Sequence, residues 1–146
     1  MRIFFFYFLL FSFVFLLPNY TFAQKIPINI VKIYDGDTLF INMDKNFFYL
    51  RLVGIDCYET KNISRAYKQA CTDNLTVEEV IKKGLYSKKY LEDLHKKAQI
   101  VSFKFMGQDK YKRTLGVLYF DDENINEKLL ENNICKPYTY KKRENN

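Results

Sequence analysis

Three charged side chains occur close together at the end of one apolar stretch. Leu50–Thr60 reads LRLVGIDCYET, with Arg51 on the predicted strand and Asp56 and Glu59 in the turn after it. A guanidinium binds phosphate oxygens through its planar fork, while carboxylates bind hard cations or activate water. Such a strand usually carries only a surface salt bridge, so this stretch needs partners elsewhere before it indicates a site.

Two further charged residues supply those partners. Asp37 follows the Asp35-Gly36 turn, and Arg113 precedes the last predicted strand. Oxygen ligands without histidine or thiolate spacing suit Ca²⁺ or Mg²⁺. Hydrolysis of a phosphodiester needs a metal to neutralise charge, cations at the phosphorus and a base for water. These residues together therefore predict phosphodiester chemistry.

Strands must position these side chains. Asp35-Gly36 lies between two apolar runs and predicts a hairpin in which glycine takes a positive φ. In the third run, simple alternation puts Arg51 and Asp56 on opposite faces, so the backbone must turn at or just after Gly54. The five predicted strands are Ile26–Tyr34, Thr38–Met43, Phe47–Ile55, Gln99–Met106 and Thr114–Phe120.

Helices are predicted between the third and fourth strands and after the fifth. Thr76 and Glu79 form a capping box, and Gly84 is placed to end that short helix. A second helix follows it, and a last one covers Asn126–Asn132, where Asn133 can take a left-handed cap. The order β-β-β-α-β-β-α is that of a five-stranded OB-fold barrel in the α+β class. A small α+β fold with an open sheet is the alternative.

The chain length and its first segment predict an exported single domain. The chain has 146 residues. Residues 1–23 have a basic start, an apolar run and small residues before a cleavage point after Ala23, which is the pattern of a signal peptide. An uncleaved membrane anchor is the alternative, although the run is short for a span. We expect one domain at residues 24–146, with its core at about 26–140, in the periplasm or outside the cell.

Charge and cysteine content narrow the expected partners. The chain carries 23 Lys and Arg against 17 Asp and Glu, a net charge of +6, which favours polyanions such as nucleic acid. Cys57, Cys71 and Cys135 allow one disulfide with one thiol left over, and the sequence does not choose among the three pairings. The single histidine, His95, lies in a Lys-rich segment and is expected at the surface.

Three separated motifs resemble the staphylococcal (thermonuclease) nuclease family in order and spacing. They are Val31–Thr38 (VKIYDGDT), Arg51 with Asp56–Thr60 (DCYET), and Asp109–Arg113 (DKYKR). The resemblance covers about residues 26–140, and three motifs in register are more specific than any one alone. It implies a Ca²⁺-dependent nuclease that acts as a monomer. Its substrates would be DNA and RNA, cleaved with little sequence preference, with single-stranded or unpaired regions preferred.

The resemblance also implies a role for each matching residue. The positions that bind the scissile phosphate or activate water are Arg51, Glu59 and Arg113. The positions that would hold Ca²⁺ are Asp37, Asp56 and the main-chain carbonyl of Cys57. The supporting and substrate-binding positions are Asp35, Lys110, Tyr111, Tyr138 and Tyr140. Stacking on tyrosines tolerates any base, which fits a nuclease without sequence preference.

The chain departs from the family pattern at two side chains and one region. Tyr58 stands where the family usually has proline, and Lys112 stands where it has glycine, so the lysine is strained if that position needs a positive φ. A region around Cys71–Lys83 is inserted relative to the staphylococcal enzyme.

The alternative function is a non-catalytic OB-fold module that binds nucleic acid or protein. The presence of all five charged positions favours the enzyme, because converging like charges cost stability.

Overall fold

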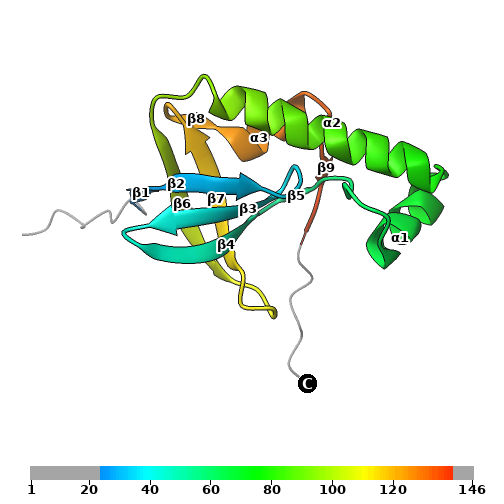
Figure 1. The fold of residues 1–146 in the computed structure, drawn as a ribbon, viewed down its shortest axis with the longest axis horizontal. Coiled ribbons are helices and arrows are strands. Elements are labelled where there is room, and N and C mark those ends of the chain that lie inside the picture. Colours follow the sequence, from blue (N-terminus) through cyan, green and yellow to red (C-terminus); the bar gives the residue numbers. More distant parts are fainter. Residues whose placement is uncertain (1–23, 140–146) are drawn as a thin grey trace, which may run out of the picture.

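The computed structural model describes residues 24–139 and gives a mixed α+β fold with a large sheet and three helices (Figure 1). The strands are β1 (Lys25–Pro27), β2 (Asn29–Ile33), β3 (Thr38–Met43), β4 (Asn46–Leu52), β5 (Ile55–Asp56), β6 (Val101–Gln108), β7 (Thr114–Phe120), β8 (Glu123–Asn124) and β9 (Lys136–Pro137). The helices are α1 (Ser64–Asp73), α2 (Val77–His95) and α3 (Ile125–Glu131). None of the helices in this part of the chain is long and apolar enough to span a bilayer. The predicted signal peptide lies outside the described residues.

The large sheet follows the order β1-β6-β7-β4-β3-β2, with β8 paired to β7. Its neighbouring strands pair antiparallel, except that β4 and β7 run parallel. β1 and β2 stand at opposite ends of this order, although only Ile28 separates them in the sequence. The Ile28 amide donates a hydrogen bond of 3.0 Å to the carbonyl of Val101. β5 and β9 form a separate two-stranded sheet.

The predicted hairpin at Asp35-Gly36 is confirmed, because β2 and β3 pair antiparallel on either side of it. The predicted reason for the glycine was wrong, since Gly36 is not among the residues with positive φ. A Cβ atom at Gly36 would instead lie 2.7 Å from both the Cys57 Sγ and the Ser87 Oγ. Glycine is needed there because the turn packs directly against a sulfur atom and against α2.

The third strand ends earlier than predicted. β4 stops at Leu52, and Ile55 belongs to β5, which pairs with β9 rather than with the large sheet. Gly54 between them has a φ of 76°, a conformation that residues with a Cβ atom rarely adopt. The prediction of a backbone turn at Gly54 is therefore confirmed, and this turn frees Asp56 from the alternation of β4.

The long helix α2 begins at the predicted capping box. The Glu79 amide donates to the Thr76 hydroxyl oxygen at 3.1 Å, and the Thr76 amide donates to the Glu79 carboxylate at 2.8 Å. The prediction that Gly84 ends this helix was wrong, because α2 continues to His95. A Cβ atom at Gly84 would overlap the carbonyl oxygen of Glu59. The glycine therefore lets α2 pack against the chain that carries Glu59.

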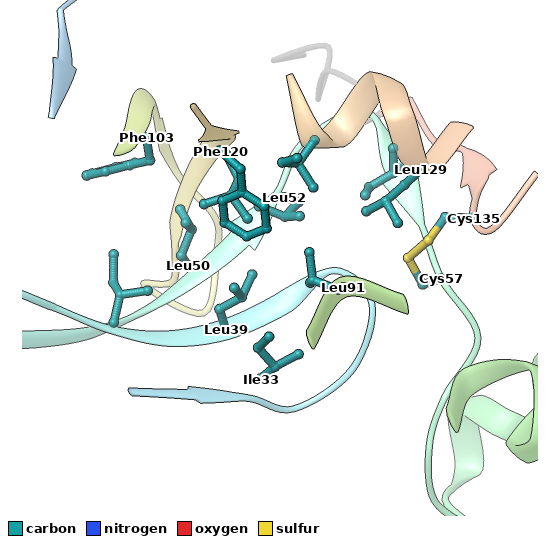
Figure 2. Packing of buried hydrophobic residues seen from close by; sticks show 14 of the residues in the cluster. Ile33, Leu39, Leu50, Leu52, Cys57, Leu91, Phe103, Phe120, Leu129 and Cys135 are labelled. Carbon is teal, nitrogen blue, oxygen red and sulfur yellow. A yellow bond between two sulfur atoms is a disulfide. The ribbon is translucent and has the colours of Figure 1, made fainter. Parts of the chain in front are cut away.

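The hydrophobic core lies between the sheet and the helices (Figure 2). Leu39 of β3, Leu91 of α2 and Leu129 of α3 point into it and are fully buried. His95 was expected at the surface, but it is half-buried, with its ring centroid 5.7 Å from that of Phe120. The last helix is close to its predicted bounds, and the residue after its cap, Asn133, has the predicted left-handed φ, 54°.

Candidate active site

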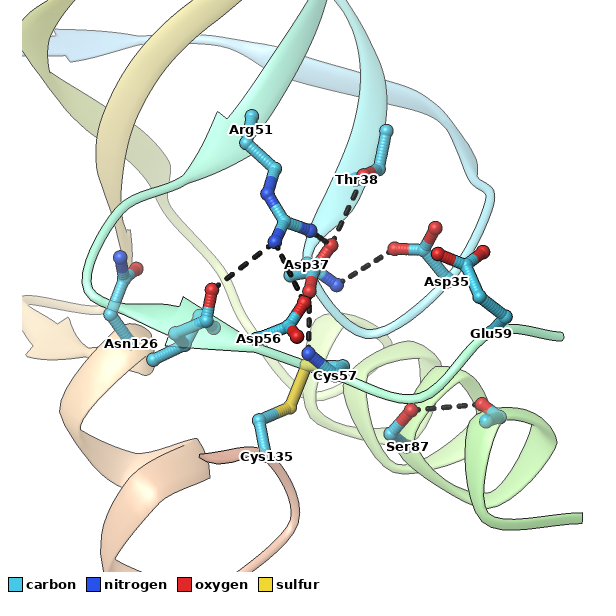
Figure 3. The surroundings of a disulfide bond; sticks show 12 residues. Asp35, Asp37, Thr38, Arg51, Asp56, Cys57, Glu59, Ser87, Asn126 and Cys135 are labelled. Atoms are coloured by element: carbon cyan, nitrogen blue, oxygen red, sulfur yellow. Dashed lines mark hydrogen bonds and ion pairs between the residues drawn. A yellow bond between two sulfur atoms is a disulfide. The ribbon is translucent and has the colours of Figure 1, made fainter. Parts of the chain in front are cut away.

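A buried arginine joins two carboxylates at the end of β4. Arg51 is only 6% exposed, and its guanidinium makes an ion pair with Asp37 (Figure 3). Its Nη2 atom also donates to Asp56 Oδ1 at 3.2 Å and to the carbonyl of Ile55 at 3.3 Å. Residues 37 and 56 are distant in sequence, so only the fold brings them to one cation. We call Asp37, Arg51, Asp56 and Glu59 the carboxylate cluster.

Asp37 is the most enclosed member of this cluster, at 1% exposure. Besides Arg51, it accepts hydrogen bonds from the Thr38 hydroxyl at 3.1 Å and from the Cys57 amide at 2.6 Å. A buried carboxylate is tolerated only when its charge is paired and its lone pairs are occupied. These three donors meet that requirement, and they tie the β2–β3 hairpin to the chain after β5.

A disulfide and an asparagine fix the backbone beneath the cluster. Cys57 and Cys135 form the disulfide, with their Cα atoms 4.4 Å apart, and Cys71 is a free, exposed thiol. Asn126 of α3 donates to the carbonyl of Val53 at 2.8 Å and accepts from the amide of Leu118 at 3.0 Å. The structure thus selects one of the three pairings that the sequence left open. Both connections attach the turn around Gly54 to the C-terminal part of the chain.

Asp35 lies beside the cluster, next to its member Glu59 (Figure 3). Asp35 accepts a hydrogen bond from the Asp37 amide at 3.0 Å. Burial raises the pKa of Asp35, against the opposing charges of Arg51 and Arg113. Burial, and next the negative charge of Asp35, raise the pKa of Glu59. A carboxylate with a raised pKa is a better proton acceptor, which suits a general base.

Sequence reasoning missed two residues of α1 that contact the cluster. The Arg65 guanidinium donates to Asp56 Oδ1 at 2.5 Å and makes an ion pair with Glu59 Oε1 at 2.8 Å. The Gln69 side chain donates to the Cys57 carbonyl at 2.9 Å and accepts from the Glu59 amide at 3.0 Å. The four-residue spacing of Arg65 and Gln69 on a helix was the one signal that could have placed both on one face.

Arg113 lies in a different setting from Arg51. It is held in the turn between β6 and β7, where its Nε atom makes a 2.7 Å ion pair with Asp109. Within the described residues it makes no hydrogen bond or ion pair with the carboxylate cluster, although its positive charge acts against the rise in the pKa of Asp35 that burial causes. Tyr111 of the same turn is 68% exposed, and the Nζ atom of Lys110 lies 4.9 Å from the centre of its ring. The fold therefore brings this turn near the cluster without joining the two.

The predicted stacking tyrosines fall at the C-terminal end of the described chain. The Tyr138 amide donates to the carbonyl of Gly54 at 2.9 Å, and this residue is 41% exposed. Tyr138 also interacts electrostatically with Arg65, which places it near the cluster. Tyr140 lies outside the described residues, so its role stays a prediction.

The oxygen donors of the cluster fit a hard cation in kind. Asp37, Asp56 and the Cys57 carbonyl are hard oxygen ligands, the type that Ca²⁺ prefers. Asp37 is hydrogen-bonded to the amide of Cys57, and Asp37 and Asp56 both contact Arg51, so the three donors belong to one group. Residues 24–139 contain no group of three or more His, Cys, Asp or Glu side chains arranged to hold a metal ion. Calcium therefore stays a prediction.

Comparison with known proteins identifies the family. Residues 49–146 match the staphylococcal nuclease homologue family, so the chain belongs to this family of nucleases. The chain is also 25% identical over 119 residues to an uncharacterized protein, MJ1439, of Methanocaldococcus jannaschii. That match covers 75% of this chain and 58% of the archaeal protein's length. The predicted family resemblance is confirmed.

Proposed function

We propose that this protein is a Ca²⁺-dependent nuclease that hydrolyses phosphodiester bonds of DNA and RNA with little sequence preference. The observation that carries the proposal is Arg51, buried between Asp37 and Asp56 with Glu59 alongside, in a chain of the staphylococcal nuclease homologue family. A buried arginine beside carboxylates costs desolvation energy, and a phosphate-binding function explains why the fold bears that cost.

Each charged residue has a separate role in this proposal. Arg51 and Arg113 donate hydrogen bonds to the non-bridging oxygens of the scissile phosphate and stabilise the charge that develops there. Glu59 takes a proton from the attacking water at its carboxylate oxygen. Asp37, Asp56 and the Cys57 carbonyl would hold Ca²⁺. When bound, the ion neutralises negative charge on the phosphate and positions it.

Arg65 and Gln69 position the segment that carries Glu59. Tyr58 replaces the proline of the family pattern, so the backbone between Asp56 and Glu59 lacks that fixed φ. Gln69 holds both sides of Tyr58 through the Cys57 carbonyl and the Glu59 amide. We expect Gln69→Ala to lower kcat more than it changes KM, with little loss in thermal stability. Gln69→Glu, which cannot donate to the carbonyl, serves as the comparison. Unchanged kcat in both variants would contradict this role.

The proposal also includes a closed barrel for the sheet and export of the protein from the cytoplasm. β1 and β2 are joined through Ile28 and stand at opposite ends of the sheet order, which supports a closed five-stranded OB barrel built from β1–β2, β3, β4, β6 and β7. The disulfide supports an oxidising compartment, in line with cleavage of a signal after Ala23 and a periplasmic or secreted monomer.

Cleavage of nucleic acid by residues 24–146 tests the proposed function. We expect degradation of plasmid and single-stranded DNA in Ca²⁺ and none in EGTA. Glu59→Gln and Arg113→Ala should each lower the rate on the order of 10²-fold, the scale for losing one transition-state donor. Tyr86→Ala, at an exposed aromatic residue of α2, is the matched control. If the protein is instead a non-catalytic binding module, it should bind DNA without cleaving it. Cleavage at equal rates in Ca²⁺ and in EGTA would contradict the assignment of calcium.

A further inference from the structure

Four aromatic side chains form a continuous row on the surface of the large sheet. The rings of Phe47 and Phe40 are stacked with centroids 6.0 Å apart, and Phe40 lies 5.1 Å from Tyr49. Tyr49 in turn lies 5.6 Å from Tyr34, in the β2–β3 turn. We call Phe47, Phe40, Tyr49 and Tyr34 the aromatic row. Cross-strand aromatic pairs stabilise sheets, but that role alone does not require the rings to be exposed.

The row is continuous with the carboxylate cluster. Phe47, Tyr49 and Arg51 alternate along β4 and therefore share one face of it. The register agrees, because Tyr49 lies opposite Phe40 and Arg51 lies opposite Thr38. Side chains two residues apart on a strand are about 7 Å apart, so the row begins one such step from the guanidinium. A ligand bound at Arg51 can therefore extend directly onto the row.

Tyr34, at one end of the aromatic row, also lies near the site. Tyr34 precedes Asp35, and its carbonyl accepts a hydrogen bond of 3.3 Å from the hydroxyl of Thr60, the residue after Glu59. The Nζ atom of Lys32 lies 4.8 Å from the centre of the Tyr34 ring. A cation beside a ring offers a backbone phosphate a partner next to the face on which a base stacks.

Two of the four rings are exposed to a ligand, and those of Phe40 and Tyr34 are half-buried. Phe47 is 57% exposed and Tyr49 is 44% exposed, although burial of such side chains is normally favourable. Exposed aromatic rings interleaved with cations are typical of surfaces that bind single-stranded nucleic acid without sequence preference. The net charge of +6 favours the same polyanionic partner over a second copy of this basic chain.

We propose that the aromatic row binds single-stranded nucleic acid, with its rings stacking on the bases next to the nucleotide whose phosphate lies at Arg51. Lys32 neutralises a phosphate of the same strand. The row rests on the proposed function for its orientation at the cluster, but its binding of a single strand can be measured without cleavage. It would extend the bound length beyond the β6–β7 turn and Tyr138, which belong to other segments than the row.

Binding of fluorescein-labelled oligothymidylates in EDTA tests the row. Phe47→Ala and Tyr49→Ala should each weaken the binding of a twenty-nucleotide strand by about tenfold, the scale for losing one stacked base. They should weaken a three-nucleotide strand less. Phe47→Tyr should restore binding, since it keeps a ring. Tyr86→Ala, whose ring is 61% exposed on α2, is the control and should bind as the unmodified protein does. Lys32→Ala should reduce the dependence of binding on salt concentration.

Two results would overturn the proposal. One is unchanged affinity of Phe47→Ala for the long strand in a variant that melts with normal cooperativity. The other is a concentration-dependent dimer in sedimentation velocity that Phe47→Ala abolishes, because the row would then be an interface between two copies. The proposed function fails separately. Binding that depends on the aromatic row, without cleavage in Ca²⁺, would contradict the nuclease function but support the binding role of the row. Cleavage in Ca²⁺ with binding that does not depend on the row would support the nuclease function but contradict the binding role.

Discussion

The two candidate arginines are supported by the fold in very different ways. Arg51 is buried and contacts two carboxylates, one of which is also bonded to Thr38 and Cys57. Arg113 lies in a surface turn, where it pairs with Asp109 and approaches the Tyr111 ring, and the Asp109 carboxylate also accepts from the amides of residues 111 and 113. The carboxylate cluster is therefore fixed by several segments of the chain, whereas Arg113 is held by residues of its own turn. We expect the first region to govern both stability and activity, and the second to govern mainly activity, with only small effects on stability.

The largest expected difference between the regions is in the free energy of unfolding. Arg51→Ala leaves Asp37 buried without its counter-charge and should cost about 3–5 kcal/mol. Arg113→Ala breaks a partly exposed pair and should cost at most about 1 kcal/mol. Urea denaturation of both variants measures the contrast. Equal losses would show that the turn is supported as strongly as the cluster.

The second largest loss of stability is expected from removal of the disulfide, which supports the carboxylate cluster and not the β6–β7 turn. Replacing both Cys57 and Cys135 with Ala opens a link across 78 residues and should lower stability by about 2–5 kcal/mol. Cys71→Ala, at the exposed free thiol, is the control and should leave the free energy of unfolding unchanged. Thermal melting with and without reductant gives the same comparison for the unmodified protein. A loss below about 1 kcal/mol in the double variant would mean that Asn126 and Gln69 already fix this backbone.

The β6–β7 turn should respond to acid through Asp109. Burial acts to raise the pKa of Asp109, but hydrogen bonds from Arg113 and the Tyr111 amide outweigh it and lower the pKa below 3.8. A depressed pKa contributes stability that is present above the unfolded value and is lost as pH falls through the folded value. Asp109→Asn should therefore melt below the unmodified protein at pH 7, and the gap should narrow below pH 3.8. A gap that is constant with pH would contradict this.

The smallest expected effect is a gain in stability at Lys112. Its φ of 63° is a left-handed conformation that costs a lysine about 1 kcal/mol relative to glycine. Lys112→Gly should therefore stabilise the protein slightly, and this would confirm that the turn carries local strain. Lys110→Gly is the matched control, since Lys110 is not among the residues with positive φ, and it should be destabilising. Thermal melting of the two variants measures whether Lys112→Gly raises and Lys110→Gly lowers the melting temperature.

Sequence reasoning predicted most of the strands and the family, and it missed contacts between distant segments. The hairpin at Asp35-Gly36, the turn at Gly54 and the capping box at Thr76 depend on local chemistry, and the structure has all three. Gly36 and Gly84 were both misread, because each glycine is required by a close approach of another segment. Local rules describe backbone freedom, but they do not contain information about what lies across the fold.

The sequence alone determined which chemical groups are available: carboxylates at 37, 56 and 59, arginines at 51 and 113, and a hydrophobic pattern that favours strands around a small core. The tertiary structure decided their partners. It placed Arg51 between Asp37 and Asp56, left Arg113 in its turn with Asp109, and brought Arg65 to Glu59. The physical reason is that charge pairing and burial depend on distance in space, which a linear spacing does not fix.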